Sequence, residues 1–185
     1  MNDSRDIAYD ETQHAWRNRF LLTIIACESV ILTMILGAFA AKATGQQRTE
    51  ILIAWLVCVI VMPAIILSIR LRTKIMGRTL RVWFPPFPGW KIDLGTVTHA
   101  QHKKLSPMGD LGGWGYKWTR KHGHAMNIYG EQFVVLTLDN DKKRTIGTQR
   151  PEELLTAIRV LAHLPPDESE ISTLQGATTR VEDAQ

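Results

Sequence analysis

Two long apolar stretches dominate the pattern of hydrophobic and polar positions along the chain. Residues 20–41 contain a single charged side chain, Glu28, and residues 51–69 contain none. Each stretch is long enough, as a helix, to cross the hydrocarbon core of a bilayer, which is about 30 Å thick. Residues 42–50 between them are mostly polar and are expected to lie in water as a loop. The pattern therefore predicts a transmembrane helical hairpin over residues 20–69.

The pattern changes after the second apolar stretch. Short alternating segments, aromatic residues and Gly- or Pro-rich turns predict a β-rich (α+β) cytoplasmic domain over residues 70–163. Its last element is expected to be an amphipathic helix, because Pro151 and two glutamates precede leucines and an isoleucine on one face. Residues 1–19 show no sustained apolar periodicity and are expected to be a flexible cytoplasmic segment or to extend the first helix. The acidic tail, residues 164–185, has too little apolar surface to fold and is expected to be disordered.

Basic residues near the hairpin predict its orientation, more than the net charge of +4 does. Arg17 and Arg19 precede the first span, whereas the connecting loop carries only Lys42 and Arg48. Five more basic residues follow the second span closely, namely Arg70, Arg72, Lys74, Arg78 and Arg81. Because cytoplasmic flanks carry the excess of Lys and Arg, we expect a multi-pass protein of the cell (inner) membrane with both termini in the cytoplasm. The five residues are expected to form a basic collar that attracts anionic lipid headgroups, each contributing about 1 kcal/mol.

A cleaved signal peptide is the alternative interpretation of the first apolar stretch, since Ala38-Phe39-Ala40 resembles a cleavage site. The stretch is longer than a signal core of about 7–15 residues, and a long polar segment precedes it. These features favour a retained span. Cys27 and Cys58 lie in the two spans at depths that differ by roughly 8 Å, which is too far for a disulfide.

Small residues recur at every fourth position of the first span: Ser29, Thr33, Gly37 and Ala41. This spacing places them on one helix face and lets another helix approach closely. The second span of the same chain is the expected neighbour. Self-association of two hairpins into a homo-oligomer is the alternative.

Glu28 is the one carboxylate inside a predicted span. At that depth an unpaired carboxylate costs several kcal/mol unless it is protonated. Pro63 lies at similar depth on the second span and frees the carbonyl of Val59, to which a protonated Glu28 could donate a hydrogen bond. A proton or ion site is the functional alternative.

Three motifs follow one another in the β-rich region. Residues 112–116 read Gly-Gly-Trp-Gly-Tyr, residues 129–131 read Tyr-Gly-Glu and lead into an alternating strand, and residues 145–154 lead the last strand into the final helix. After a membrane hairpin, this order resembles the bacterial PH-like (pleckstrin-homology-like) domains of small membrane proteins. The resemblance covers about residues 70–163. It implies a bent, partly open β-barrel of about seven strands, capped at one end by the C-terminal helix.

The sequence shows no catalytic constellation, and we expect neither a cofactor nor a metal site. The histidine pairs His99/His102 and His122/His124 lack further ligands at suitable spacing. The glycine-rich residues 109–115 match neither a phosphate-binding loop nor a dinucleotide fingerprint. Beside a membrane span, anionic lipid explains the mixture of basic and aromatic residues more simply than nucleic acid does.

The expected function is therefore non-enzymatic. The chain is expected to be a membrane-anchored PH-like module that binds a protein partner or scaffolds a complex at the cytoplasmic membrane face. The alternative is a lipid- or ion-handling membrane component, such as an accessory transporter subunit, that uses Glu28.

Overall fold

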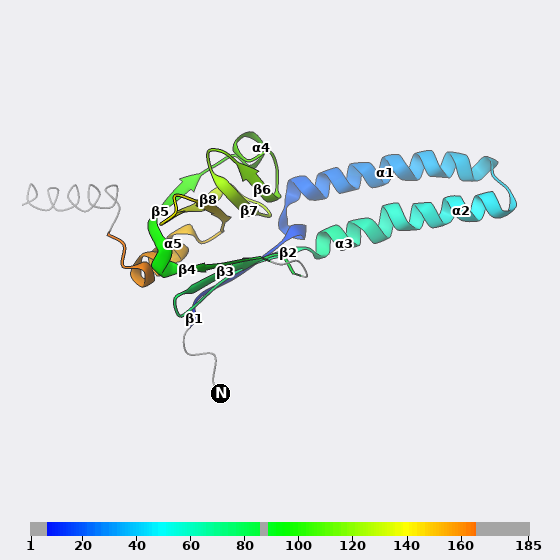
Figure 1. Ribbon diagram of the computed structural model, residues 1–185. Helices are drawn as coiled ribbons and strands as arrows, with labels where there is room; N and C mark the ends of the chain where they lie inside the picture. Colours follow the sequence, from blue (N-terminus) through cyan, green and yellow to red (C-terminus); the bar gives the residue numbers. More distant parts are fainter. Residues whose placement is uncertain (1–6, 86–88, 166–185) are drawn as a thin grey trace, which may run out of the picture.

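A helical hairpin projects from a β domain in the computed structural model, which describes residues 7–85 and 89–165 (Figure 1). The first helix is α1 (Arg19–Lys42), and the second runs continuously over Gly45–Ser68. Both are long and apolar enough to cross a membrane, and their apolar windows are not buried inside the structure. The connection is shorter than the loop predicted over residues 42–50, because most of those polar residues continue the second helix.

The second helix changes its hydrogen-bonding pattern in the middle. It begins as α2 (Gly45–Trp55), passes through a π-helical turn, η2 (Leu56–Val61), and ends as α3 (Met62–Ser68). Pro63 is the second residue of α3, and one residue separates it from the end of the π turn. Because proline has no N–H and its ring crowds the preceding turn, the regular α-helical ladder is interrupted there.

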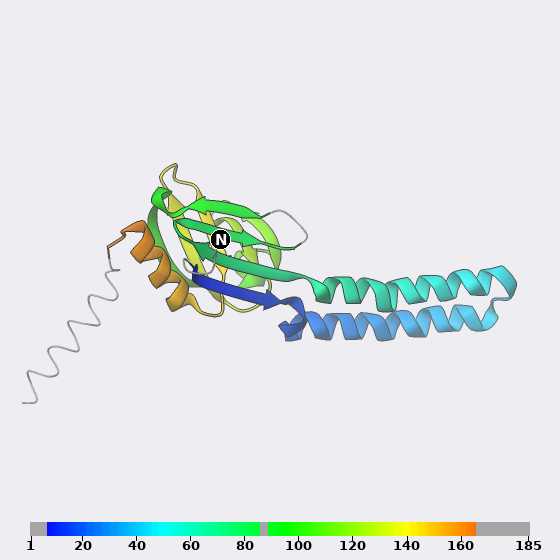
Figure 2. The same cartoon turned by 90° about the horizontal axis from the view of Figure 1, so that it is seen from below.

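A four-stranded antiparallel sheet is formed from strands on both sides of the hairpin. Its order is β1 (Ile7–His14), β2 (Arg70–Met76), β3 (Thr79–Trp83) and β4 (Trp90–Asp93). Strand β1 precedes the hairpin and pairs with β2, which follows it, so the two strands continue from the bases of the two helices (Figure 2).

The interpretation of residues 1–19 as flexible or helical is therefore wrong for residues 7–14. The buried positions of β1 are Tyr9, Glu11 and Gln13, and two of these side chains are polar. A strand whose inward face carries polar residues lacks the apolar alternation by which strands are recognised in a sequence.

A second sheet has five strands in the order β5 (Val97–Lys104), β8 (Gln132–Leu138), β9 (Lys143–Gly147), β7 (Gly123–Asn127) and β6 (Gly115–Thr119). All neighbours are antiparallel except β7 and β9. Short helices complete the connections: η1 (Ala15–Arg17), η3 (Leu94–Thr96) and α4 (Pro107–Asp110). Over the described residues the strands form two sheets that do not close, rather than the predicted barrel of about seven strands.

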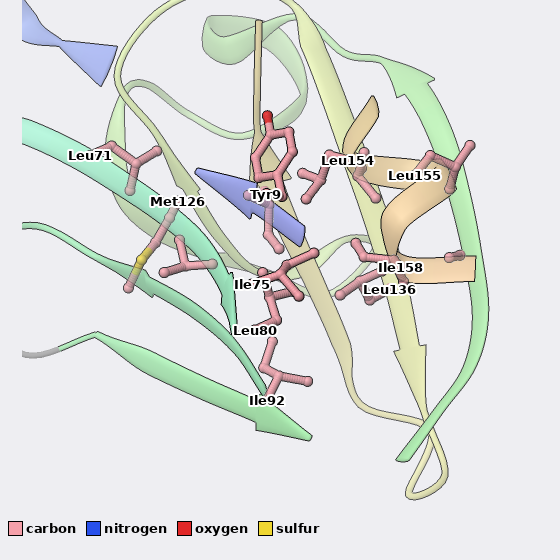
Figure 3. Close-up of a cluster of buried hydrophobic side chains, with 14 of the residues drawn as sticks. Tyr9, Leu71, Ile75, Leu80, Ile92, Met126, Leu136, Leu154, Leu155 and Ile158 are labelled. Atoms are coloured by element: carbon pink, nitrogen blue, oxygen red, sulfur yellow. The ribbon is translucent and has the colours of Figure 1, made fainter. Parts of the chain in front are cut away.

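The main core lies between the two sheets and under the last helix, α5 (Pro151–Ala162) (Figure 3). Helix α5 has the predicted start at Pro151, and the left-handed residue His163 ends it. The labelled core side chains come from all three layers: Leu71, Ile75, Leu80 and Ile92 from the first sheet, Met126 and Leu136 from the second, and Leu154, Leu155 and Ile158 from α5.

A buried carboxylate joins β1 to the end of the second sheet. Glu11 is 7% exposed and accepts hydrogen bonds from the Tyr9 hydroxyl (2.6 Å), the Thr148 hydroxyl (2.7 Å) and the Gln149 backbone N–H (2.8 Å). Burial, reinforced by Glu11, raises the pKa of Tyr9, so this hydroxyl keeps its proton and donates. Gln13 adds a hydrogen bond to the Gly147 carbonyl (2.8 Å). The buried polar side chains of β1 are thus hydrogen-bonded to the end of β9 and to the residues that connect it to α5.

Replacement of Glu11 by alanine should destabilise the domain, because it leaves these donors without their acceptor in a buried place. We expect the free energy of unfolding of the full chain in detergent to fall by at least about 2 kcal/mol. The matched control is Asp10→Ala, which removes only a partly exposed ion pair with Arg72 and should cost at most about 1 kcal/mol. Equal losses in the two variants would contradict the structural role of Glu11.

Candidate functional site

An apolar pocket of about 530 Å³ lies between the edges of the two sheets. Its walls come from the end of the hairpin and the first sheet on one side (Ile69, Phe84, Gly89, Trp90) and from β6 and β7 on the other (Gly115, Tyr116, Met126). Strands β4 and β6 are the outer strands of their sheets and are not paired with each other. The pocket thus occupies the seam at which the sheets fail to close, and its volume is that of a small-molecule site.

The pocket opens near the base of the hairpin. Ile69 is the residue that ends α3 and directly precedes β2, so the pocket wall is continuous with the second apolar helix. On the other side, the Trp114 ring, next to Gly115, lies 5.1 Å from the Phe20 ring in the first turn of α1. A ligand of this pocket would therefore sit beside both helix ends.

Aromatic and basic side chains form the rim. The Trp90 ring centroid lies 6.0 Å from that of Tyr116 and 6.4 Å from that of His124, and the Tyr116 hydroxyl is hydrogen-bonded to Nδ1 of His124. The Arg144 guanidinium lies 5.3 Å from the centre of the Trp90 ring. Partial burial, followed by the charges of Arg144 and Lys142, lowers the pKa of His124. The rim thus carries the Arg144 cation, and the lowered pKa favours the neutral form of the His124 imidazole beside the two aromatic rings.

Strand register explains how these rim residues come together. In the β6–β7 pair, Tyr116 is opposite Met126 and Trp118 is opposite His124, so all four occupy the face that turns toward the first sheet. Met126 is buried in the core, whereas Tyr116 and Trp118 are 52% and 62% exposed. The face therefore changes from apolar to open and aromatic along the strand.

The five basic residues expected to form a collar lie on β2, in the turn after it and on β3. Arg70, Arg72 and Lys74 alternate along the outer face of β2, and Arg81 is opposite Lys74 on β3. Strand β2 continues the direction of α3 (Figure 2), so Lys74, four residues after Arg70, lies further from the helix. Arg78 lies in the turn at the far end of β2. The row leads away from the helices, and only its first members adjoin their ends.

Glu28 lies on the exposed surface of α1 and forms no hydrogen bond or ion pair with any residue that the structure describes. The bond expected to the Val59 carbonyl is therefore not formed.

The predicted row of small residues contacts the second helix in part. Ser29 is half-buried, the Thr33 hydroxyl accepts a hydrogen bond from Trp55 Nε1 (3.0 Å), and Gly37 lines a cavity of about 270 Å³ between the helices. Ala41, in contrast, is exposed. The two helices of one hairpin thus meet at Ser29 and Thr33, whereas a Cβ at Gly37 would have no neighbour within 4 Å, so the close approach expected at this glycine stays a prediction.

The histidines are distributed over different environments. His99 is exposed, His102 shares a hydrogen bond with the Gln132 side chain (2.6 Å), and His122 is buried. Within residues 7–85 and 89–165, no group of three or more His, Cys, Asp or Glu side chains is placed to hold a metal ion.

Comparisons of the chain with protein-family models, with curated proteins and with solved structures found no significant match. The candidate site is therefore argued from its own geometry. The sequence indicated the aromatic residues Trp90, Trp114 and Tyr116, but nothing in it connected them with Ile69 and Met126. Their proximity depends on the pairing of distant strands.

Proposed function

We propose that the protein is a non-enzymatic, membrane-anchored PH-like module that binds a protein partner at the cytoplasmic membrane face. The observation that carries this proposal is the free edge of β6, which bears Trp118 with 62% of its surface exposed. An outer strand presents unpaired N–H and C=O groups that an extended segment of a partner can pair with. Exposed aromatic side chains beside such an edge are typical anchors of protein interfaces.

The connection between hairpin and domain supports a scaffolding role. Asn18 accepts a hydrogen bond from the Leu21 N–H (3.1 Å), which caps α1, and donates from its amide to the Ile128 carbonyl (3.0 Å). On the other side, only Ile69 separates α3 from β2. Two short, hydrogen-bonded connections hold the domain in one orientation relative to the hairpin. The β6 edge is consequently presented at a defined position near the membrane.

The PH-like assignment rests on the same elements that suggested it in the sequence. Residues 112–116 lead into β6, and residues 145–154 pass from β9 into α5, which covers the core between two sheets. The open seam distinguishes this domain from a closed barrel. We interpret the chain as a divergent member of that class, in which the opening serves binding.

The proposed topology can be tested with single cysteines in a variant that lacks Cys27 and Cys58. A cysteine at Gln46, in the first turn of α2 beside the hairpin connection, should react with an impermeant thiol reagent added to intact cells. A cysteine at the exposed Thr98, in the β domain, should react only after the membrane is permeabilised. Labelling of the Thr98 variant in intact cells would overturn the cytoplasmic placement.

Partner binding can be tested by placing a photoreactive amino acid at Trp118 in the full-length protein in cells. We expect one discrete crosslinked species, because the side chain lies beside the free edge of β6. The control position is the exposed His99 on β5, at the opposite edge of the same sheet, which should give no such species. Crosslinking that is absent at Trp118, or equal at the two positions, would exclude β6 as the binding edge.

A second candidate function is supported by the exposed position of Glu28. A carboxylate in the hydrocarbon region requires a partner or a proton, and no described residue of this chain supplies a partner. This is the arrangement needed by a lipid- or ion-handling component, for example an accessory transporter subunit, in which Glu28 acts at a boundary with another molecule.

Glu28→Gln separates the two candidates, because the amide keeps the size of the side chain but cannot ionise. If Glu28 carries protons or ions, this variant should fail to complement the defect of a deletion strain while its protein level stays normal. The matched control is Glu50→Gln near the hairpin connection, which should complement fully. Complementation by Glu28→Gln at normal protein level would eliminate the ion-handling function.

A further inference from the structure

We propose that the pocket between β4 and β6 holds one acyl chain of an anionic phospholipid from the membrane in which the hairpin lies. This inference rests on the proposed membrane anchoring and is independent of partner binding by the β6 edge. It assigns a ligand to the part of the seam that lies closest to the hairpin.

The lining favours a hydrocarbon chain. Phe84 and Met126 are 8% and 3% exposed, and they form the inner wall together with Ile69. Water in such a space has few hydrogen-bond partners. Its replacement by apolar groups therefore lowers the free energy. A peptide segment would carry backbone N–H and C=O groups into the same space, and each one left unpaired there would be unfavourable.

The position of the mouth favours a ligand that comes from the bilayer. Ile69 belongs at once to the end of the second apolar helix and to the pocket wall, and Trp114 contacts Phe20 at the start of the first helix. An acyl chain can therefore pass from the hydrocarbon region into the pocket along a continuous apolar surface. A ligand from the cytoplasm would have no comparable path along the helices.

The rim favours a negatively charged headgroup. The Arg144 guanidinium covers Trp90 and donates only to a backbone carbonyl (Lys143, 3.3 Å), and it forms no ion pair with a described acidic residue. His124 and Tyr116 add polar groups beside it. A headgroup that remains outside while its chain fills the pocket would be close to these donors. A cation that such a headgroup reaches would contribute about 1 kcal/mol to the attraction of an anionic lipid.

The test uses the full-length protein in lipid nanodiscs that contain phosphatidylglycerol with a photoreactive group near the end of one acyl chain. After irradiation, mass spectrometry should find the lipid on peptides that contain Trp90, Tyr116 or Met126, in addition to peptides of α1 and α3. Ile69→Trp fills the pocket and should abolish labelling of the β-strand peptides. The matched control is Ile65→Trp, one turn earlier and exposed on α3, which should leave that labelling unchanged.

A second variant tests the charge of the headgroup. Arg144→Gln should reduce labelling of the pocket by the anionic lipid about fivefold, the equivalent of about 1 kcal/mol, and should not change labelling by a phosphatidylcholine with the same chain. If Ile69→Trp does not fold, Tyr116→Ala replaces it, because the change removes one wall at an exposed site and should lower the labelling of the Trp90 peptide.

Labelling that is confined to the helices, or that persists in Ile69→Trp, would overturn the lipid site while leaving membrane anchoring intact. Absence of label from the helices as well would remove the membrane anchoring on which both proposals depend. The two failures are therefore distinguishable in one experiment.

Discussion

The structure depends on the insertion of the hairpin between two strands that are hydrogen-bonded to each other. The β1–β2 ladder continues to the helix ends, where the Ala15 N–H donates to the Ile69 carbonyl (2.9 Å). Paired strands lie about 4.8 Å apart, whereas packed helices lie about 8–10 Å apart. The turn η1 (Ala15–Arg17) and the capping residue Asn18 accommodate this change of spacing on one side, and the direct passage from α3 to β2 fixes the other.

This connectivity makes the β domain a product of both ends of the hairpin. Residues 70–163 alone lack β1, and with it the carboxylate of Glu11 that organises the connection between β9 and α5. The main-chain and hydroxyl donors of Thr148 and Gln149 would then face solvent or remain unpaired. A soluble fragment that begins at residue 70 is consequently not the folded unit of this protein. Any study of the domain requires β1, supplied by the full chain or by a linker in place of the hairpin.

The sequence predicted those elements whose physical signal is local. The two apolar helices and α5 follow from composition and periodicity, and the structure contains all three. Strand β1 was missed because two of its inward residues are polar. Burial of the Glu11 side chain becomes favourable only when the distant Thr148 and Gln149 donate hydrogen bonds to it. The basic collar stays a prediction, and a count along the chain does not show that β2, which carries three of its residues, leads away from the helices. The pocket was not predictable, since it exists between strands that are far apart in sequence and are not paired.

Exposed strand edges pair with other chains unless they are covered or charged, so the open seam between β4 and β6 calls for protection. Under the proposed membrane anchoring, the hairpin would limit the directions from which another chain can reach this seam. Its proximal part, at Ile69 and Met126, is apolar and adjoins the helix ends, whereas its distal part, at Trp118, is open and aromatic. Under the two proposals, a hydrocarbon chain would occupy the first part and a protein segment would pair with β6 at the second.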